Sequence, residues 1–234
     1  MKLCVLENDI IDDVVADRYP SYGVLFTDLF RSAKPDIEVD VFDAMNMQYP
    51  DSFDDYDAVL LSGSRCDAFG QEEWVLELKK RTEQLMAEKK KLIGVCFGHQ
   101  LIALILGAEM GRAPQGWGMG RMSYTWNKES SPIALEGEGF SLLVSHQDQV
   151  LTEPKGATII ASSEFCPIAA YTVDKHVICF QGNPEFVEGY SEYIINKRKD
   201  SLTPEQYERF LGSLQYGHDG KKIAKLVCDF VEQV

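Results

Sequence analysis

The sequence predicts an α/β protein that forms one domain. Its 234 residues suit a single domain with a full hydrophobic core. Short apolar runs that predict buried strands, such as residues 2–6, 58–61 and 92–95, alternate with longer segments of helical spacing. No internal repeat or low-complexity linker divides the chain. We therefore expect residues 1–234 to form one domain, with a helical tail over about residues 188–234.

The composition argues against several kinds of partner. The formal net charge is −14, which disfavours binding to nucleic acid or to an anionic membrane surface. No apolar run approaches the roughly 20 residues that a membrane-spanning helix needs. The N-terminus reaches Glu7 and Asp9 too soon for a signal peptide. We expect a cytoplasmic protein with neither a membrane nor a nucleic-acid partner.

The cysteines and histidines predict neither a metal site nor a disulfide framework. The six cysteines contain no CxxC pair, and several fall in expected strands. The four histidines lack the spacing of metal ligands. Unpaired thiols of this kind are typical of a reducing compartment. The sequence therefore predicts reduced cysteines, no metal and no cofactor.

The first part of the chain predicts a strand, a loop, a helix and a second strand. Residues 2–6 form the strand, and the polar, acidic residues 8–20 follow it as a loop. A loop after a strand of an α/β sheet lies on the ligand side. Helical spacing predicts a helix over 22–32, which Pro35 ends, and residues 37–42 alternate as a strand.

The same reasoning places the later elements. Residues 49–57 form an acidic loop before the buried strand 58–61, and residues 107–120 form a glycine-rich loop. Further strands are expected over residues 121–126, 140–144, 158–161, 168–173 and 177–181, and further helices over residues 72–89, 188–199, 203–214 and 221–234.

The stretch from Lys91 to Gly107 predicts a nucleophile elbow. A buried strand ends at a sharp turn on Cys96, and an apolar helix follows from about Phe97. Gly94 and Gly98 stand two residues on either side of Cys96, which is the G-x-nucleophile-x-G pattern with cysteine as the nucleophile. Such a turn needs glycines because the flanking chains pass close together.

The elbow has two chemical consequences. The N-terminus of the helix favours the thiolate form of Cys96, and the Phe97 N–H is an oxyanion donor. A second strand, 58–61, runs into Ser62-Gly63-Ser64, where the Gly63 N–H is placed to supply the second donor.

The string Gly-Val-Cys-Phe-Gly-His-Gln resembles the nucleophile motif of class I glutamine amidotransferases and their γ-glutamyl peptidase relatives. The resemblance implies a flavodoxin-like three-layer α/β sandwich. It also implies hydrolysis of a γ-glutamyl amide, in glutamine or in a γ-glutamyl peptide or amine, through a glutamyl thioester on Cys96. The motif looks closer to the free-standing, peptidase-like members. A separate ammonia-using synthetase subunit is the other arrangement that the family allows.

The resemblance also implies substrate-binding positions. The family's strand–Ser-Gly-Ser-Pro loop matches residues 62–65, except that Arg65 replaces the proline and so removes its rigidity. His99 is constrained by the elbow, and we do not expect it to be the base. The implied substrate-binding residues are Ser64, Gln100, Gly116, Trp117, Ser145, His146, Gln147 and Asp148.

The family's catalytic histidine is replaced in this chain. The family strand ends in His-Pro-Glu, in which the histidine is the general base for the cysteine and the glutamate fixes the imidazole. Here Pro184 and Glu185 match, but the histidine position holds Asn183. An amide cannot take up a proton near neutral pH, so Asn183 should impair acylation and thioester hydrolysis.

Two origins of Asn183 are compatible with the sequence. One is a replacement made to trap a substrate or an acyl-enzyme. The other is a natural γ-glutamyl-ligand-binding or regulatory pseudoenzyme without turnover. A third hypothesis, an elbow-bearing cysteine hydrolase for another acyl group, is disfavoured by the Asn-Pro-Glu strand end.

Overall fold

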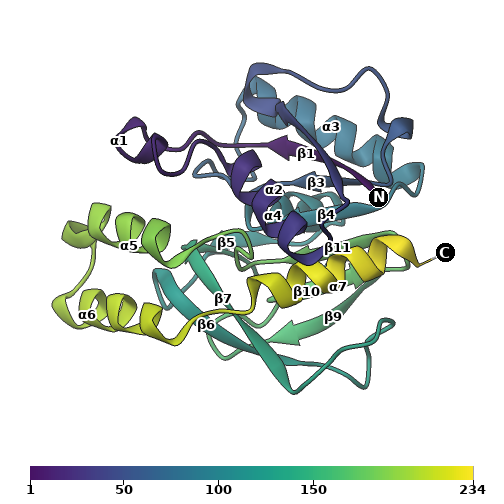
Figure 1. Ribbon diagram of the computed structural model, residues 1–234. Coiled ribbons are helices and arrows are strands. Elements are labelled where there is room, and N and C mark those ends of the chain that lie inside the picture. The colour runs from purple at the N-terminus through teal and green to yellow at the C-terminus, as the bar shows by residue number, and fades with distance from the viewer. Residues whose placement is uncertain (234) are drawn as a thin grey trace.

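The computed structural model describes residues 1–233, and its centre is a nine-stranded mixed sheet (Figure 1). The strand order is β2-β1-β3-β4-β11-β10-β9-β6-β7. The pairs from β2 to β11 are parallel, and those from β11 to β7 are antiparallel. The strands are β1 (Lys2–Glu7), β2 (Glu38–Asp43), β3 (Ala58–Leu61), β4 (Leu92–Val95), β6 (Gly118–Trp126), β7 (Gly139–His146), β9 (Ala157–Ser162), β10 (Ala170–Val173) and β11 (Val177–Phe180).

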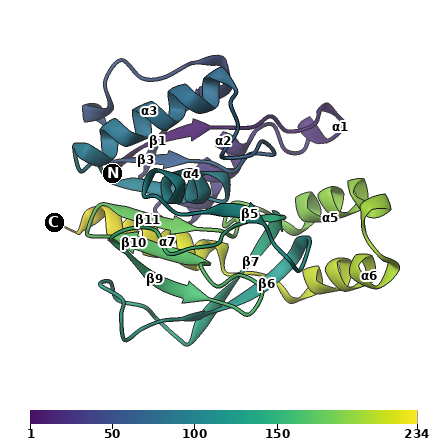
Figure 2. The same ribbon diagram turned by 180° about the vertical axis from the view of Figure 1, so that it is seen from behind.

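Helices cover both faces of the sheet. Figure 1 has α2 (Tyr22–Ala33) and α7 (Gly220–Glu232) on the near side, and Figure 2 has α4 (Phe97–Ile105) on the near side, next to α3 (Glu73–Ala87). The strands supply both layers because successive side chains point to opposite faces. Leu3 and Val5 of β1 pack in the α2–α7 layer, whereas Cys4 and Leu6 pack in the α3–α4 layer. The predicted three-layer sandwich is confirmed.

Three further helices lie beyond one end of the sheet. They are α1 (Asp13–Ala16), α5 (Glu188–Lys197) and α6 (Pro204–Ser213), and Figure 1 shows them on the side opposite to both termini. Thr203 starts α6 with a capping box, since its hydroxyl accepts from the Gln206 N–H and the Gln206 side chain accepts from the Thr203 N–H. This is the end of the sheet where α/β proteins bind ligands.

Some boundaries differ from the sequence expectations. The loop expected over residues 8–20 contains the one-turn helix α1, and β6 begins at Gly118, inside the expected glycine-rich loop. Two short strands, β5 (Met110–Arg112) and β8 (Asp148–Val150), form a separate antiparallel pair. Each is three residues long and is stabilised by a distant partner, so local periodicity could not reveal it.

Candidate active site

Cys96 lies on a strained turn between β4 and α4. Its φ is 51° and its ψ is −100°, in a region that L-residues rarely adopt. The two flanking glycines are required by close packing. A Cβ on Gly98 would lie 2.4 Å from the Leu61 carbonyl oxygen, and one on Gly94 would lie 2.8 Å from the Cys179 sulfur. The chain thus has the elbow geometry that the sequence predicts.

A cavity opens above Cys96, at the end of the sheet that α1 and α5 flank. Five predicted site residues line it: Gly63, Ser64, Cys96, Ser145 and Asn183. The other lining residues are Asp9, Asp12, Tyr22, Arg65, Phe186, Tyr190, Ile194, Lys197 and Arg198.

Asn183 lies just beyond β11 and is held on both sides. Its backbone N–H donates to the Leu143 carbonyl (2.9 Å), and its side-chain Nδ2 donates to Glu185 Oε1 (2.9 Å). A Cβ on Gly63 would lie 3.2 Å from Asn183 Nδ2 and 3.5 Å from the Cys96 Cβ. Gly63, Cys96 and Asn183 are therefore immediate neighbours, and a Cβ at position 63 would press against the Asn183 amide.

The electrostatic surroundings of Cys96 correct the thiolate expectation. Burial, and next the charge of Glu185, raise the pKa of Cys96 to about 12, while a hydrogen bond from the Phe97 N–H acts in the opposite direction. The thiol is therefore the neutral-pH form, because the helix N-terminus does not offset desolvation. Burial also raises the pKa of Glu185 to about 8, and the Asn183 hydrogen bond lowers it.

No histidine of the described chain lines the cavity. His99 is fully buried, its ring centroid is 4.9 Å from that of Tyr171, and burial lowers its pKa to about 3. His146 is buried with its Nδ1 3.1 Å from the Asp148 carbonyl oxygen, and burial lowers its pKa to about 4. Neither imidazole lines the cavity, so neither is placed to accept a proton from Cys96.

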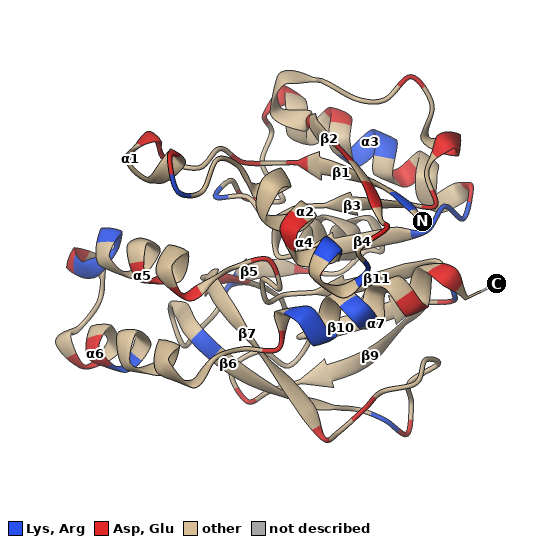
Figure 3. Ribbon diagram, in the orientation of Figure 1, with Lys and Arg blue, Asp and Glu red and all other residues tan. Residues whose placement is uncertain are grey.

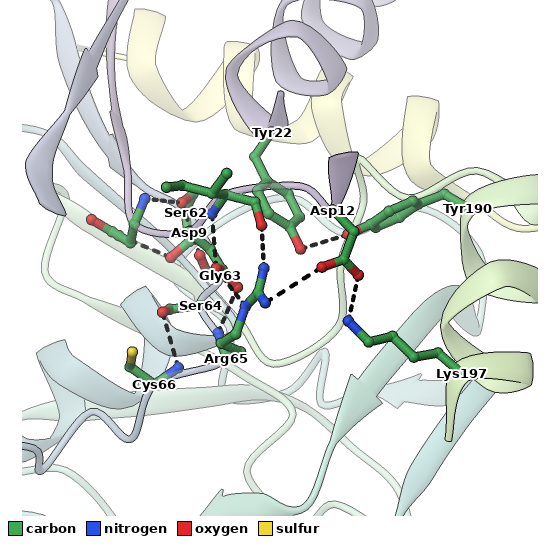
Figure 4. A network of polar contacts seen from close by, with 12 residues as sticks. Asp9, Asp12, Tyr22, Ser62, Gly63, Ser64, Arg65, Cys66, Tyr190 and Lys197 are labelled. Atoms are coloured by element: carbon green, nitrogen blue, oxygen red, sulfur yellow. Dashed lines mark hydrogen bonds and ion pairs between the residues drawn. The ribbon is translucent and has the colours of Figure 1, made fainter. Parts of the chain in front are cut away.

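Arg65 fastens the loop after β3 to the loop after β1 (Figure 4). Its backbone N–H and its Nε donate to the two Asp9 carboxylate oxygens, both at 2.8 Å, and its Nη2 donates to the Ile10 carbonyl. Its Nη1 lies 3.7 Å from Asp12, which also pairs with Lys197 of α5. The missing proline therefore does not leave this loop unsupported: an ion-pair network restrains it.

Six predicted substrate-binding residues do not line the cavity. Gln100 is buried below it, donating to the Asp148 carbonyl (3.0 Å) and to Gln181 Oε1 (3.1 Å). The Asp148 carboxylate pairs with Arg112 (2.9 Å), at the small β5–β8 sheet. Trp117 does not line the cavity itself. Its ring packs against the guanidinium of Arg198, which does line the cavity. The remaining three are Gly116, His146 and Gln147.

The sequence reasoning missed the wall that α5 contributes. Tyr190, Ile194, Lys197 and Arg198 are spaced i, i+4, i+7 and i+8, which places them on one helical face. That periodicity is visible in the sequence, but it does not say which neighbour the face meets. Within residues 1–233, no group of three or more His, Cys, Asp or Glu side chains could hold a metal ion. No helix in that range is both long and apolar enough to cross a bilayer.

Comparison with known proteins identifies the family. Residues 14–199 match the family model for glutamine amidotransferase class-I. Gamma-glutamyl peptidase 3 of Arabidopsis thaliana is 35% identical over 182 residues, which cover 74% of this chain and 72% of that protein. Gamma-glutamyl peptidase 2 of the same plant is 30% identical over 81% of this chain and 84% of its own length. The chain belongs to the class I glutamine amidotransferase family.

Solved structures agree on the fold. A glutamine amidotransferase from Thermotoga maritima superposes with a TM-score of 0.77 at 18% identity, covering 100% of this chain and 99% of its own. One from Methylobacillus flagellatus gives 0.73 at 19% identity, covering 99% and 93%. The three-layer architecture is thus that of class I glutamine amidotransferases, a family of amide-hydrolysing enzymes.

Proposed function

We propose that the chain hydrolyses a γ-glutamyl amide bond through a glutamyl thioester on Cys96, and that Asn183 limits this reaction. The observation that carries the proposal is the strained turn that aims Cys96 into a cavity beside Gly63 and Asn183. In this reaction the sulfur attacks the γ-carbonyl carbon, and the oxygen becomes an oxyanion. The N–H groups of Gly63 and Phe97 stabilise that negative charge by donating hydrogen bonds to the oxygen.

Asn183 can make the hydrogen bond to Glu185 that a histidine would make, but it cannot transfer a proton. Its Nδ2 donor keeps Glu185 in a hydrogen bond, so the carboxyl remains oriented. Its Oδ1, which has no hydrogen-bond partner within the described residues, can align a thiol or an amine but cannot accept a proton. Deprotonation of Cys96 and activation of water therefore lack a general base, and protonation of the departing nitrogen lacks a general acid. Such a group typically contributes about 10²–10⁴-fold to a step.

The second candidate is a γ-glutamyl-ligand-binding or regulatory protein without turnover. The pKa of about 12 for Cys96 favours it, because almost no thiolate is present at neutral pH. The relatives named gamma-glutamyl peptidase support γ-glutamyl peptides as ligands, whereas γ-glutamyl amines and glutamine stay predictions. A separate synthetase subunit that receives ammonia stays a prediction.

The test is intact-mass spectrometry of the protein after mixing with glutamine or with a γ-glutamyl dipeptide. We expect a slowly formed glutamyl adduct on Cys96 that persists, and no adduct in a Cys96→Ala variant. An Asn183→His variant should release ammonia or amine without accumulating the adduct. If neither the unchanged chain nor the histidine variant reacts, while the ligand still binds, the second candidate takes the place of the first.

A further inference from the structure

Arg198, at the end of α5, is a half-buried cation without an acidic partner among the described residues. Its guanidinium carbon lies 4.1 Å from the centre of the Trp117 ring, and its side chain lines the cavity that contains Cys96. A basic residue at a helix C-terminus is common, since it complements the helix dipole. That preference does not explain a guanidinium packed on an indole and presented to a cavity.

The other charges of the cavity are already paired. Asp9 is held by Arg65, and Asp12 is held by Lys197 and more loosely by Arg65. Figure 4 shows this network, and Figure 3 shows basic residues at the outer end of α5 in a chain with many acidic residues. Arg198 therefore leaves one uncompensated positive charge in the cavity, and that charge favours an anionic ligand group.

The position of Asn183 indicates which part of a substrate reaches Arg198. The leaving nitrogen of an amide must face the base position, because it is protonated from there. The chain passes from Asn183 through Phe186 into α5, whose face with Tyr190 and Ile194 forms the wall beyond that position. From Tyr190 to Arg198 the helix rises about 12 Å, so a leaving group that follows this wall is longer than one residue.

We propose that Arg198 binds the terminal carboxylate of a peptide leaving group and selects γ-glutamyl peptides over γ-glutamyl amines and glutamine. The inference rests on the proposed function for the direction in which the substrate lies. A guanidinium recognises a planar carboxylate through two parallel hydrogen bonds. Trp117 is a positioning residue in this site, because its ring fixes the plane of the guanidinium.

The test is calorimetric binding in a Cys96→Ala background, where no acylation interferes. The two probes are γ-glutamyl-alanyl-glycine and its C-terminal amide, which differ only in the carboxylate. We expect the acid to bind about 10- to 100-fold more tightly than the amide. Arg198→Gln should weaken binding of the acid far more than binding of the amide, so that the two probes bind about equally, and Trp117→Leu should reduce the preference in part. Arg209→Gln, outside the cavity, is the matched control and should change neither affinity.

Three results would overturn the assignment: equal affinity for the two probes in the parent, equal losses for both probes in Arg198→Gln, or no binding of either probe. Equal losses would mean that Arg198 contacts the glutamyl part or supports the fold. The mass-spectrometric adduct on Cys96 tests the proposed function separately. An adduct with either probe together with equal affinities would retain the hydrolase and reject the role of Arg198.

Discussion

At the scale of single residues, the proposed chemistry depends most on position 183. The Asn183 amide keeps one property of an imidazole, the N–H that donates to Glu185 at 2.9 Å. It lacks the other, a nitrogen that accepts a proton at neutral pH. Burial and the nearby Glu185 therefore dominate the pKa of Cys96, because no imidazolium stands at position 183 to favour the thiolate.

The first prediction concerns the reactivity of Cys96. With a pKa of about 12, its alkylation by iodoacetamide should rise about tenfold per pH unit from pH 6 to pH 9 without reaching a plateau. Asn183→His should react faster throughout and show an inflection within this range, because an imidazolium stabilises the thiolate. Peptide mapping of Cys96 after timed labelling measures both. A plateau below pH 9 in the unchanged chain would contradict the pKa assignment.

The second prediction concerns Glu185 and stability. Its pKa is about 8 in the folded protein, above the ordinary value of 4.5. Between these values the unfolded chain releases a proton that the folded protein keeps, so the free energy of unfolding should fall as pH rises. The slope contributed by this one group is at most about 1.4 kcal/mol per pH unit.

Urea unfolding at several pH values from 5 to 8 isolates that contribution. The unchanged chain should lose more stability across this range than Glu185→Gln, which has no proton to release there. Parallel pH profiles for the two proteins would show that Glu185 ionises normally in the folded state.

At the scale of elements, the elbow depends on α4 lying directly against β3. We predict that Gly98→Ala destabilises the protein by about 1–3 kcal/mol, because its Cβ would lie 2.4 Å from a backbone oxygen. Gly212→Ala in α6 is the control, since no atom lies within 4 Å of its added Cβ. It should be neutral or stabilising by about 0.5–1 kcal/mol. Equal unfolding midpoints in urea would refute the packing argument.

The ion-pair network of Arg65 connects three elements, since it joins the loops after β1 and β3 to α5. We predict that Arg65→Ala lowers stability by about 1–3 kcal/mol, because Asp9 is 5% exposed and would lose its ion-pair partner. Lys225→Ala, which breaks an exposed pair with Asp229, should cost at most about 0.5 kcal/mol. Chemical denaturation of the unchanged chain and of the two variants measures these free energies of unfolding. Similar losses in both variants would mean that Arg65 is an ordinary surface residue.

At the scale of the whole molecule, the central sheet differs from the rim, by which we mean α1, α5 and the loop around Arg65 at the carboxyl ends of the parallel strands. The alternating side chains of the central strands bury apolar layers on both faces and fix the carboxyl ends of β3, β4 and β11 side by side. The rim around the cavity is joined in two ways. An ion-pair network links the Arg65 loop to Asp12 and α5, and an apolar cluster includes Ile11, Phe186 and Tyr190. In the proposed function, the sheet holds the nucleophile Cys96, and the residues around the cavity select the substrate.

The sequence predicted the parts that depend on local patterns. Residues 92–95, Cys96 and the two flanking glycines were sufficient to place the elbow. Asp9 and Asp12, from the loop expected over residues 8–20, line the cavity that contains Cys96. The β5–β8 pair and the wall formed by α5 depend on contacts between distant segments, which periodicity does not specify. The thiol form of Cys96 was also missed, since burial outweighs the helix N-terminus only in the folded molecule.

The most direct test of the account is the rate of amine release from γ-glutamyl-alanyl-glycine by the unchanged chain and by Asn183→His. The account predicts that the histidine variant is faster by about 10²–10⁴-fold, and that adding Cys96→Ala removes the gain. If the variant folds and binds the peptide but is no faster than the unchanged chain, residue 183 is not what limits hydrolysis and the central claim is wrong.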